Sequence, residues 1–231
     1  MGHKKLIRFN AIKTFPNVLE EPKDVKGTWK EIFGNDNPIT LELACGKGEY
    51  SVGLGREHKD RNFIGVDIKG NRIYNGAKIA LNEPLPNVRF LRTQIGHIAE
   101  HFAPGEVSEI WIIFSDPFLK KPKNRLTHTR FLHLYQQILK PGSIIHLKTD
   151  SRELYEFTKE SIAENNCTIK DDIEDIYGKG LATGPLAIQT FYEKMHLAEG
   201  RIINYISFTL PETPIMLPER YRNNERPVDR G

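Results

Sequence analysis

Short apolar runs alternate along most of this chain with stretches whose apolar residues recur every three or four positions. The apolar runs predict strands over 39–43, 62–67, 88–91, 110–114, 143–147 and 201–208. The helical spacing predicts helices over 49–58, over 71–81, after an N-cap at Thr127 up to a turn at 140–142, and after an N-cap at Ser151. This alternation predicts an α/β fold with a mostly parallel sheet and helices on both faces.

The two ends of the chain lack this periodicity. Residues 1–35 read as an irregular arm, although Phe9, Phe15 and Trp29 suggest that parts of it dock. Residues 211–231 hold four of the fourteen prolines and several arginines, which predicts an extended or mobile tail; an RNA-contacting arm is the alternative. We therefore expect one domain over 36–210 between these two segments.

Composition narrows the class of protein. Of the 231 residues, 39% are hydrophobic and 27% are charged, as in globular proteins. No apolar run is long enough for a membrane helix, and the first residues lack the apolar segment of a signal peptide. Cys45 and Cys167 form neither a disulfide framework nor a metal-ligand spacing. We expect a cytoplasmic enzyme or binding protein, either a monomer or a homodimer.

Positive charge is concentrated in one segment, although the formal net charge is only +3. A stretch of eleven residues without Asp or Glu contains Lys120, Lys121, Lys123, Arg125 and Arg130. Such a patch attracts polyanions, so it is a candidate RNA-binding surface. The alternative is an ordinary solvated face.

A glycine turn follows the first predicted strand. Gly46 and Gly48 allow a sharp turn and a close approach of a ligand to the backbone. Asp67 ends the next strand, 19 residues after Gly48, where a carboxylate can hold both hydroxyls of a ribose. An ordinary turn followed by a solvated Asp is the alternative interpretation. Cys45, within the turn, is interpreted as a small packing residue rather than a nucleophile.

The choice of cofactor depends on Glu42 and Ser51. A dinucleotide-binding GxGxxG motif requires a third glycine where this chain has Ser51. Glu42 lies inside the strand before the turn, and a carboxylate there suits a cation better than a phosphate. S-adenosylmethionine carries an ammonium and a sulfonium but no phosphate, so the pattern favours methyl transfer over hydride transfer. Gln94, after the third strand, is a candidate contact for the adenine edge.

A second motif, Asp116-Pro117, follows the fourth of these strands, next to the expected cofactor site. Amino-group methylases place Asn-Pro-Pro-Tyr or Asp-Pro-Pro-Tyr there, with a tyrosine that stacks on the target base. Here Phe118 lacks the hydroxyl, so the acceptor need not be an exocyclic amine. His97 and His101 match the H-x-x-E-H zinc signature, but we interpret them as polar residues on the exposed face of a helix and expect no metal.

Together these motifs resemble the bacterial tRNA (guanine-N7)-methyltransferase family, in order from about residue 39 to residue 208. The shared features are the segments 42–48 and 114–121, Thr149-Asp150 and Thr190-Phe191-Tyr192-Glu193. Ser115 and Phe118 replace the usual Pro and Trp, Ala44 replaces a common Gly, and Gln94 stands where Asp is common. The resemblance implies a class I Rossmann-like fold with a seven-stranded sheet, S-adenosylmethionine as cofactor and tRNA as partner.

The resemblance also implies roles for individual residues. The implied cofactor-binding residues are Glu42, Gly46, Gly48, Asp67, Gln94 and Asp116. The implied substrate-binding residues are Lys120, Lys121, Lys123, Arg125, Asp150, Thr190, Tyr192 and Glu193. Three of these also have purely structural interpretations, because Asp150-Ser151 can cap the following helix and Thr190 and Glu193 can be polar loop residues.

Guanine N7 carries an in-plane lone pair, so it can accept a methyl group without first losing a proton. No general base is required, and alignment is the main source of catalysis. We expect Asp116 and Asp150 to be the catalytic residues, with Asp150 accepting hydrogen bonds from guanine N1 and N2. The family resemblance places the target guanine in the variable loop. The alternatives are a methyltransferase for a small molecule and a non-catalytic RNA-binding relative.

Overall fold

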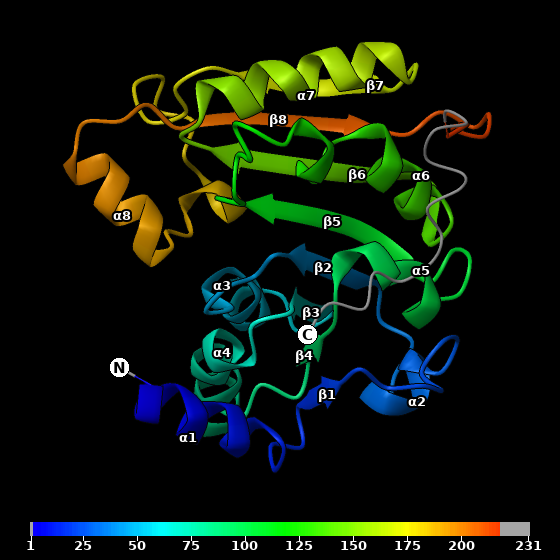
Figure 1. Ribbon diagram of the computed structural model, residues 1–231, viewed down its shortest axis with the longest axis vertical. Coiled ribbons are helices and arrows are strands. Elements are labelled where there is room, and N and C mark those ends of the chain that lie inside the picture. Colours follow the sequence, from blue (N-terminus) through cyan, green and yellow to red (C-terminus); the bar gives the residue numbers. More distant parts are fainter. Residues whose placement is uncertain (1, 218–231) are drawn as a thin grey trace.

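The computed structural model describes residues 2–217 and is built around one sheet (Figure 1). Its strands are β1 Val18–Glu20, β2 Ile39–Leu43, β3 Asn62–Asp67, β4 Val88–Arg92, β5 Val107–Ile113, β6 Leu139–Thr149, β7 Thr168–Ile173 and β8 Asn204–Thr209. They form an eight-stranded sheet in the order β1-β4-β3-β2-β5-β6-β8-β7, parallel except where β8 pairs with β6 and β7. The predicted α/β class is confirmed.

The sheet has one strand more than the seven expected, and this strand comes from the segment predicted to be an irregular arm. β1 pairs in parallel with β4, with Val18 opposite Phe90. Helix α1, Gly2–Ile12, packs on α4, and helix α2, Trp29–Phe33, buries the Trp29 side chain completely. The first 35 residues therefore complete one edge of the sheet.

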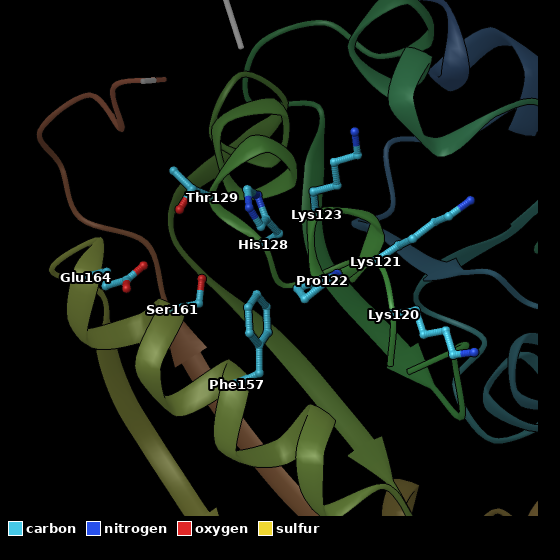
Figure 2. A pocket seen from close by; sticks show the side chains of 9 residues that line it. All are labelled: Lys120, Lys121, Pro122, Lys123, His128, Thr129, Phe157, Ser161 and Glu164. Atoms are coloured by element: carbon cyan, nitrogen blue, oxygen red, sulfur yellow. The ribbon is translucent and has the colours of Figure 1, made fainter. Parts of the chain in front are cut away.

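Helices cover both faces of the sheet. The hydrophobic cluster on one face includes α3, Glu49–Glu57, and α4, Gly70–Asn82. The cluster on the other face includes α5, Ile98–His101, α6, Thr129–Gln136, and α7, Arg152–Glu164. The segment that joins β5 to α6 lies beside α7 (Figure 2). Among the described residues, no helix has the length and apolar character needed to cross a membrane.

The start of α7 confirms the predicted N-cap, whereas the start of α6 does not. The Ser151 hydroxyl accepts a hydrogen bond from the Leu154 N–H. Helix α6 is instead capped by His128, because the Thr127 side chain is buried and its hydroxyl lies 2.8 Å from the Thr158 hydroxyl. The turn predicted at 140–142 is an exposed irregularity within the bounds of β6, where its pairing with β5 shifts register.

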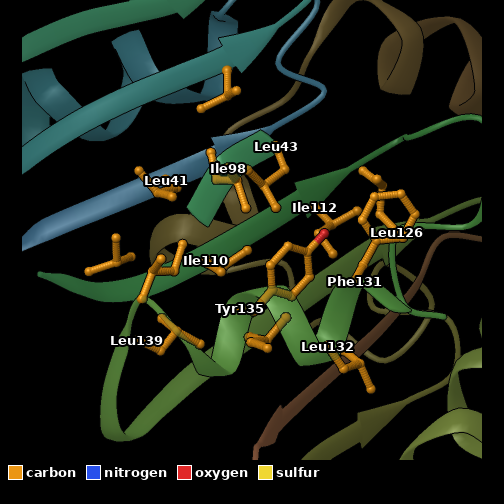
Figure 3. Packing of buried hydrophobic residues seen from close by; sticks show 14 of the residues in the cluster. Leu41, Leu43, Ile98, Ile110, Ile112, Leu126, Phe131, Leu132, Tyr135 and Leu139 are labelled. Atoms are coloured by element: carbon orange, nitrogen blue, oxygen red, sulfur yellow. The ribbon is translucent and has the colours of Figure 1, made fainter. Parts of the chain in front are cut away.

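The core shows why alternate residues of one strand meet different partners. Leu41 and Leu43 of β2 and Ile110 of β5 face the cluster formed with α5 and α6 (Figure 3). Because successive side chains of a strand point to opposite faces, Glu42 and Trp111 point toward the face covered by α3. The strand pattern thus places one carboxylate beneath the glycine turn.

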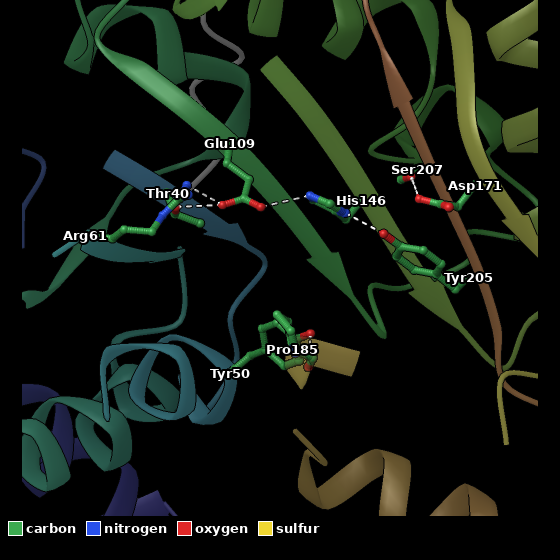
Figure 4. Close-up of polar contacts among 9 residues, drawn as sticks. All are labelled: Thr40, Tyr50, Arg61, Glu109, His146, Asp171, Pro185, Tyr205 and Ser207. Atoms are coloured by element: carbon green, nitrogen blue, oxygen red, sulfur yellow. Dashed lines mark hydrogen bonds and ion pairs between the residues drawn. The ribbon is translucent and has the colours of Figure 1, made fainter. Parts of the chain in front are cut away.

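A row of paired polar groups crosses the face of the sheet that α3 covers (Figure 4). The Glu109 carboxylate lies 2.5 Å from Arg61 Nη2 and 3.0 Å from His146 Nε2, and His146 Nδ1 lies 2.7 Å from the Tyr205 hydroxyl. The His146 ring stacks on Trp111 at 3.8 Å between centroids. Each of these atoms is paired with another in the row, so we regard the row as structural.

The first part of the predicted tail is docked. Gln136 of α6 donates to the carbonyls of Pro211 and Thr213 and accepts from the Ile215 N–H, and the Ile215 side chain is buried. Residues 211–217 therefore contain no helix or strand, but they are held against α6. The remainder of the predicted tail, for which an RNA-contacting arm is the alternative, falls on residues 218–231, which lie outside the described residues.

Candidate functional site

The order of strands reverses between β2 and β5, and ligands of open α/β sheets bind at such a point, beyond the carboxyl ends of the strands. A cavity of about 430 Å³ lies there. Its lining includes Ala44, Asp67, Gln94, Phe114, Ser115 and Asp116. The structure therefore brings the predicted cofactor residues Asp67, Gln94 and Asp116 to one cavity.

The glycine turn after β2 needs its glycines for two different reasons. Gly46 and Gly48 have φ angles of 55° and 67°, which favour glycine. A Cβ on Gly48 would lie 2.3 Å from the Phe90 ring, whereas a Cβ on Gly46 would meet nothing within 4 Å. Gly48 is thus needed for packing, and Gly46 keeps an open side where a ligand can approach. Ala44 is also left-handed, with φ of 56°, which explains the preference for Gly at that position.

Asp67 joins the end of β3 to the glycine turn. Its Oδ2 accepts a hydrogen bond from the Gly46 N–H at 2.9 Å, and its Oδ1 accepts one from the Lys69 N–H at 2.8 Å. Each carboxylate oxygen can accept more than one hydrogen bond, so Asp67 retains capacity for ligand hydroxyls. The position and the hydrogen-bonding capacity suit the predicted ribose contact.

Glu42 does not line this cavity, contrary to the direct cofactor contact predicted for it. The carboxylate is buried beneath the turn, where its Oε2 accepts from the Ser51 N–H at 2.7 Å and from the Ser51 hydroxyl at 2.5 Å. Burial raises its pKa to about 8. Glu42 therefore supports the turn and the first turn of α3 from below. Cys45 is buried too, and burial raises the pKa of its thiol, in agreement with a packing role.

The loop after β5 provides the other side of the cavity. Asp116 is exposed, and its Oδ1 accepts from the Phe118 N–H at 2.9 Å, which closes a tight turn. The Ser115 hydroxyl is buried and has no partner among the described residues. Cationic side chains of Lys69, Arg72 and Arg130 also line the cavity. The cavity thus offers carboxylates for hydroxyls or an ammonium, and cations for a carboxylate, as a zwitterionic amino acid joined to a nucleoside requires.

The basic segment divides into exposed and buried residues. Lys120, Lys121 and Lys123 are exposed. Arg125 is only 3% exposed, pairs with Glu153, donates to the Pro117 carbonyl at 2.8 Å and lies over the Phe157 ring. This placement argues against the direct RNA contact predicted for Arg125. It indicates instead that Arg125 holds the segment in shape.

Asp150 lies immediately after β6 at the same edge of the sheet. Its Oδ2 accepts from Arg201 Nη1 at 2.7 Å, and His196 Nε2 lies 3.7 Å from the same oxygen. The His196 ring also contacts Phe114, with 5.8 Å between centroids. Arg201 and His196 had not been identified from the sequence, because they are about fifty residues from Asp150 and belong to no recognisable motif.

The segment 190–193 forms the start of α8, Phe191–Ala198, rather than a polar loop. The Thr190 hydroxyl caps the helix by accepting from the Glu193 N–H. Tyr192 is exposed, whereas Glu193 is fully buried, with its Oε1 2.5 Å from Lys148 Nζ and 2.8 Å from the Tyr177 hydroxyl. The predicted contact of Glu193 with substrate is therefore not available in this arrangement.

Lys148 is a site residue that the sequence interpretation missed. Besides Glu193, its ammonium contacts the carbonyls of Leu186 and Ile188 at 2.8 and 3.2 Å, and burial lowers its pKa. It thereby holds the segment before α8 against the end of β6. The signal in the sequence is a lysine that directly follows the mostly apolar segment Ile144-Ile145-His146-Leu147.

Helix α8 also contacts the glycine turn directly. The Phe191 N–H donates to Glu49 at 3.0 Å, and the Lys47 ammonium lies 3.7 Å from the centre of the Phe191 ring. The segment implied to bind substrate therefore lies against the turn implied to bind cofactor. These contacts join two parts of the chain that are more than 140 residues apart.

The H-x-x-E-H motif falls on a 3-10 turn at Ile95–His97 and on α5. His101 is buried, with Nε2 2.9 Å from the Thr93 hydroxyl, so the expectation of an exposed face is wrong for this residue. Within residues 2–217, no group of three or more His, Cys, Asp or Glu side chains is placed to hold a metal ion.

Solved structures with a similar fold include methyltransferases. The crystal structure of the 16S rRNA methyltransferase KamB superposes with a TM-score of 0.64 over 84% of this chain and 99% of that one, at 13% identity. The structure of an antibiotic-related methyltransferase gives 0.59 over 84% and 96%, at 18% identity. These likenesses show the class I methyltransferase fold.

Sequence comparison is more specific. A family model described as "Putative methyltransferase" matches residues 36–203. The tRNA (guanine-N(7)-)-methyltransferase of Bacteroides thetaiotaomicron is 48% identical over 94% of this chain and 89% of its own length. That of Porphyromonas gingivalis is 48% identical over 87% of both. With the glycine turn, the Asp116 loop and Asp150 at one edge of the sheet, the chain belongs to the tRNA (guanine-N7-)-methyltransferase family.

Proposed function

We propose that this protein transfers a methyl group from S-adenosylmethionine to N7 of a guanine in tRNA, in the variable loop. The observation that supports this most is that one loop serves both sides of the site. Asp116 lines the cavity at the glycine turn, and Lys120, Lys121 and Lys123 follow it on the surface within a few residues. A polyanionic substrate held by these lysines lies beside the cofactor. A cytoplasmic location follows from such a substrate.

Asp67, Gln94 and Asp116 are assigned to the cofactor because they line the cavity, and Gly46 because it is hydrogen-bonded to Asp67. Asp67 accepts from the ribose hydroxyls, Gln94 contacts the adenine edge, and the open side of Gly46 faces the methionine part. Glu42 acts indirectly, because it holds the turn through Ser51. When bound, S-adenosylmethionine supplies an electrophilic methyl group. Asp116 provides a nearby carboxylate that favours the positive charge of the donor and of the product.

On the substrate side, Asp150 orients the target guanine. The carboxylate accepts from guanine N1 and N2, and Arg201 and His196 hold its Oδ2 in place. Since N7 carries a lone pair, the protein needs no residue that removes a proton. The chain contributes alignment and electrostatic stabilisation, and alignment alone supplies on the order of 7–11 kcal/mol in favourable cases.

The reaction is tested by incubating total tRNA with labelled S-adenosylmethionine and then cleaving the RNA at 7-methylguanosine. We expect label in tRNA and cleavage at one variable-loop position. Label on small metabolites alone would favour the small-molecule alternative. Absence of heat when S-adenosylhomocysteine is titrated into the protein would favour a non-catalytic RNA-binding relative.

The role of Asp150 is tested with Asp150→Asn. Hydrogen bonds to a charged group contribute about 1.5–3 kcal/mol, so kcat/KM for tRNA should fall about 10- to 150-fold while binding of S-adenosylhomocysteine is retained. Asp175→Asn, after β7, is the matched control and should leave kcat/KM unchanged. Normal turnover and guanine selectivity in Asp150→Asn would remove Asp150 from the proposal.

The lysines are tested together, because phosphate contacts are read from the salt dependence of binding. In the triple variant Lys120→Ala, Lys121→Ala, Lys123→Ala, the slope of log affinity for tRNA against log salt should decrease by up to about three units. Lys140→Ala is the control, because Lys140 is exposed and lies at the start of β6, away from the carboxyl ends of the strands. An unchanged slope in the triple variant would reject phosphate binding by this segment.

A further inference from the structure

A second cavity, of about 480 Å³, lies on the other side of the basic segment, between that segment and α7 (Figure 2). The side chains of Lys120, Lys121 and Lys123 line one side, and Phe157 and Ser161 of α7 line the other. His128 and Thr129, at the start of α6, complete the lining between them. Its volume is within the range of roughly 300–1,000 Å³ found for ligand pockets. Neither the cofactor nor the target guanine is assigned to it.

The lining of this cavity has two chemically different parts. Lys120, Lys121 and Lys123 form a cationic part, with their ammonium groups directed away from α7 in Figure 2, and Glu164 is the acidic residue of the lining, at the end of α7. Between them lies a planar surface, because the Phe157 ring is nearly parallel to His128 at 6.2 Å between centroids, with an interplanar angle of 19°. The Arg125 guanidinium lies 4.6 Å from the centre of the Phe157 ring and supports it. A phosphate, a flat ring and a hydrogen-bonding edge match these features.

We propose that this cavity binds one nucleotide of the tRNA other than the target guanine. Its phosphate contacts the lysines, its base packs against Phe157, and the edge of the base donates to Glu164. Aromatic stacking of this kind is how proteins hold unpaired nucleotides without reading a long sequence. The inference rests on the proposed function, because it takes the substrate to be tRNA.

The same segment forms a wall of both cavities, which gives the second one a role in the reaction. Arg125 Nε donates to the Pro117 carbonyl at 2.8 Å and thereby closes the segment that runs from Asp116 to the lysines. Arg125 also contacts Phe157. A base that packs on Phe157 therefore restricts the motion of the Arg125 side chain, which holds this segment. Occupation of the second cavity therefore fixes the Asp116 loop in its position beside the cofactor.

Ultraviolet cross-linking of tRNA to the unmodified protein, followed by mass mapping of the linked peptide and sequencing of the linked RNA, tests the inference without a variant. We expect a cross-link between α7 or His128 and a nucleotide that is not the methylated guanine. Phe157→Leu keeps an apolar side chain against Arg125 but removes the flat ring. Its KM for tRNA should rise at least about fivefold, the lower limit for loss of one base stack, with the Kd for S-adenosylhomocysteine unchanged.

Two controls keep this test separate from the test of the function. Lys140→Ala should leave KM unchanged, and the melting temperature of Phe157→Leu should stay close to that of the unmodified protein. If the unmodified protein methylates guanine N7 in tRNA but yields no cross-link at α7 or His128 and Phe157→Leu has a normal KM, the second cavity is not a nucleotide site. If the unmodified protein does not methylate tRNA, the proposed function itself fails.

Discussion

The cofactor side and the substrate side of this site are built in different ways. On the cofactor side, the turns that follow β2 and β3 are joined by hydrogen bonds between residues at most about twenty positions apart. The substrate side is held by contacts of long range, such as Lys148 to Glu193 and Glu49 to Phe191. Contacts between residues close in the sequence hold the first side in place. The second side depends on one segment, 176–201, which is held against the end of β6 and the start of α3.

This difference predicts which variants affect the cofactor and which affect the substrate. A change in the glycine turn acts on the cofactor through the backbone itself. A change at the Lys148 contact acts on the substrate through the placement of α8, because the Lys148 side chain lines neither cavity. The variants below are ordered by the size of the expected effect.

Lys148→Met should have the largest effect, because it leaves the Glu193 carboxylate buried without its cation. Breaking one partner of a buried ion pair costs about 3–5 kcal/mol in the free energy of unfolding, measured by urea denaturation. The double variant Lys148→Met, Glu193→Leu removes both charges and should recover much of this stability. If the double variant also recovers full activity on tRNA, the contact does not position the substrate side.

Gly48→Ala and Gly46→Ala separate packing from ligand access on the cofactor side. Both place a Cβ at a positive φ, which costs roughly 1–2 kcal/mol, but only Gly48→Ala also forces a side chain against Phe90, for about 1–3 kcal/mol more. Gly46→Ala should instead weaken binding of S-adenosylhomocysteine beyond its effect on stability. Equal losses of stability in the two variants would contradict the packing argument.

Glu42→Gln tests the buried carboxylate by its pH dependence. Because burial raises its pKa to about 8, the folded state holds a proton that the unfolded chain releases near pH 4.5. Glu42 therefore stabilises the fold below that pH, and this contribution is lost as the pH rises to about 8, with a slope of at most about 1.4 kcal/mol per pH unit. The difference between the unmodified protein and Glu42→Gln should show this slope. A difference that does not vary between pH 5 and pH 8 would rule it out.

Thr190→Val should have the smallest effect, because it removes only the cap of α8. Loss of an N-cap costs about 1 kcal/mol, whereas Thr190→Ser keeps the hydroxyl and should be nearly neutral. Since the cap lies beside the Phe191 contact with Glu49, Thr190→Val should also raise KM for tRNA. A normal KM despite the lost stability would show that the cap matters only for folding.

Most of the sheet could be predicted because its strands are buried on both faces and read as continuous apolar runs. Ile39–Leu43 and Asn62–Asp67 are fully buried and were predicted with their observed bounds. β7 could not be predicted, since its residues are largely exposed and contain a lysine and two aspartates. β1 has three residues and gains its position only by pairing with β4, which no local pattern reveals.

The residues of the site also divide into those that a local pattern predicts and those that it does not. The placement of Asp67 and Asp116 at one cavity could be predicted, because Asp67 ends β3 and Asp116 follows β5 within a few residues, both at the carboxyl ends of the strands. Glu42 was misplaced because a motif gives the residue type but not the face of the strand that it occupies. Glu193 was misplaced for a related reason, since only the folded chain shows that Lys148 and Tyr177 enclose it.

Because β1 pairs with β4, the first residues of the chain are needed to keep the sheet covered. β4 lies inside the sheet only because β1 covers its outer side. Removal of the first twenty residues would uncover the N–H and C=O groups of β4, and an uncovered strand is a template for pairing with another molecule. A shortened protein should therefore precipitate before it loses its ability to fold, and affinity tags are better placed ahead of an intact amino terminus.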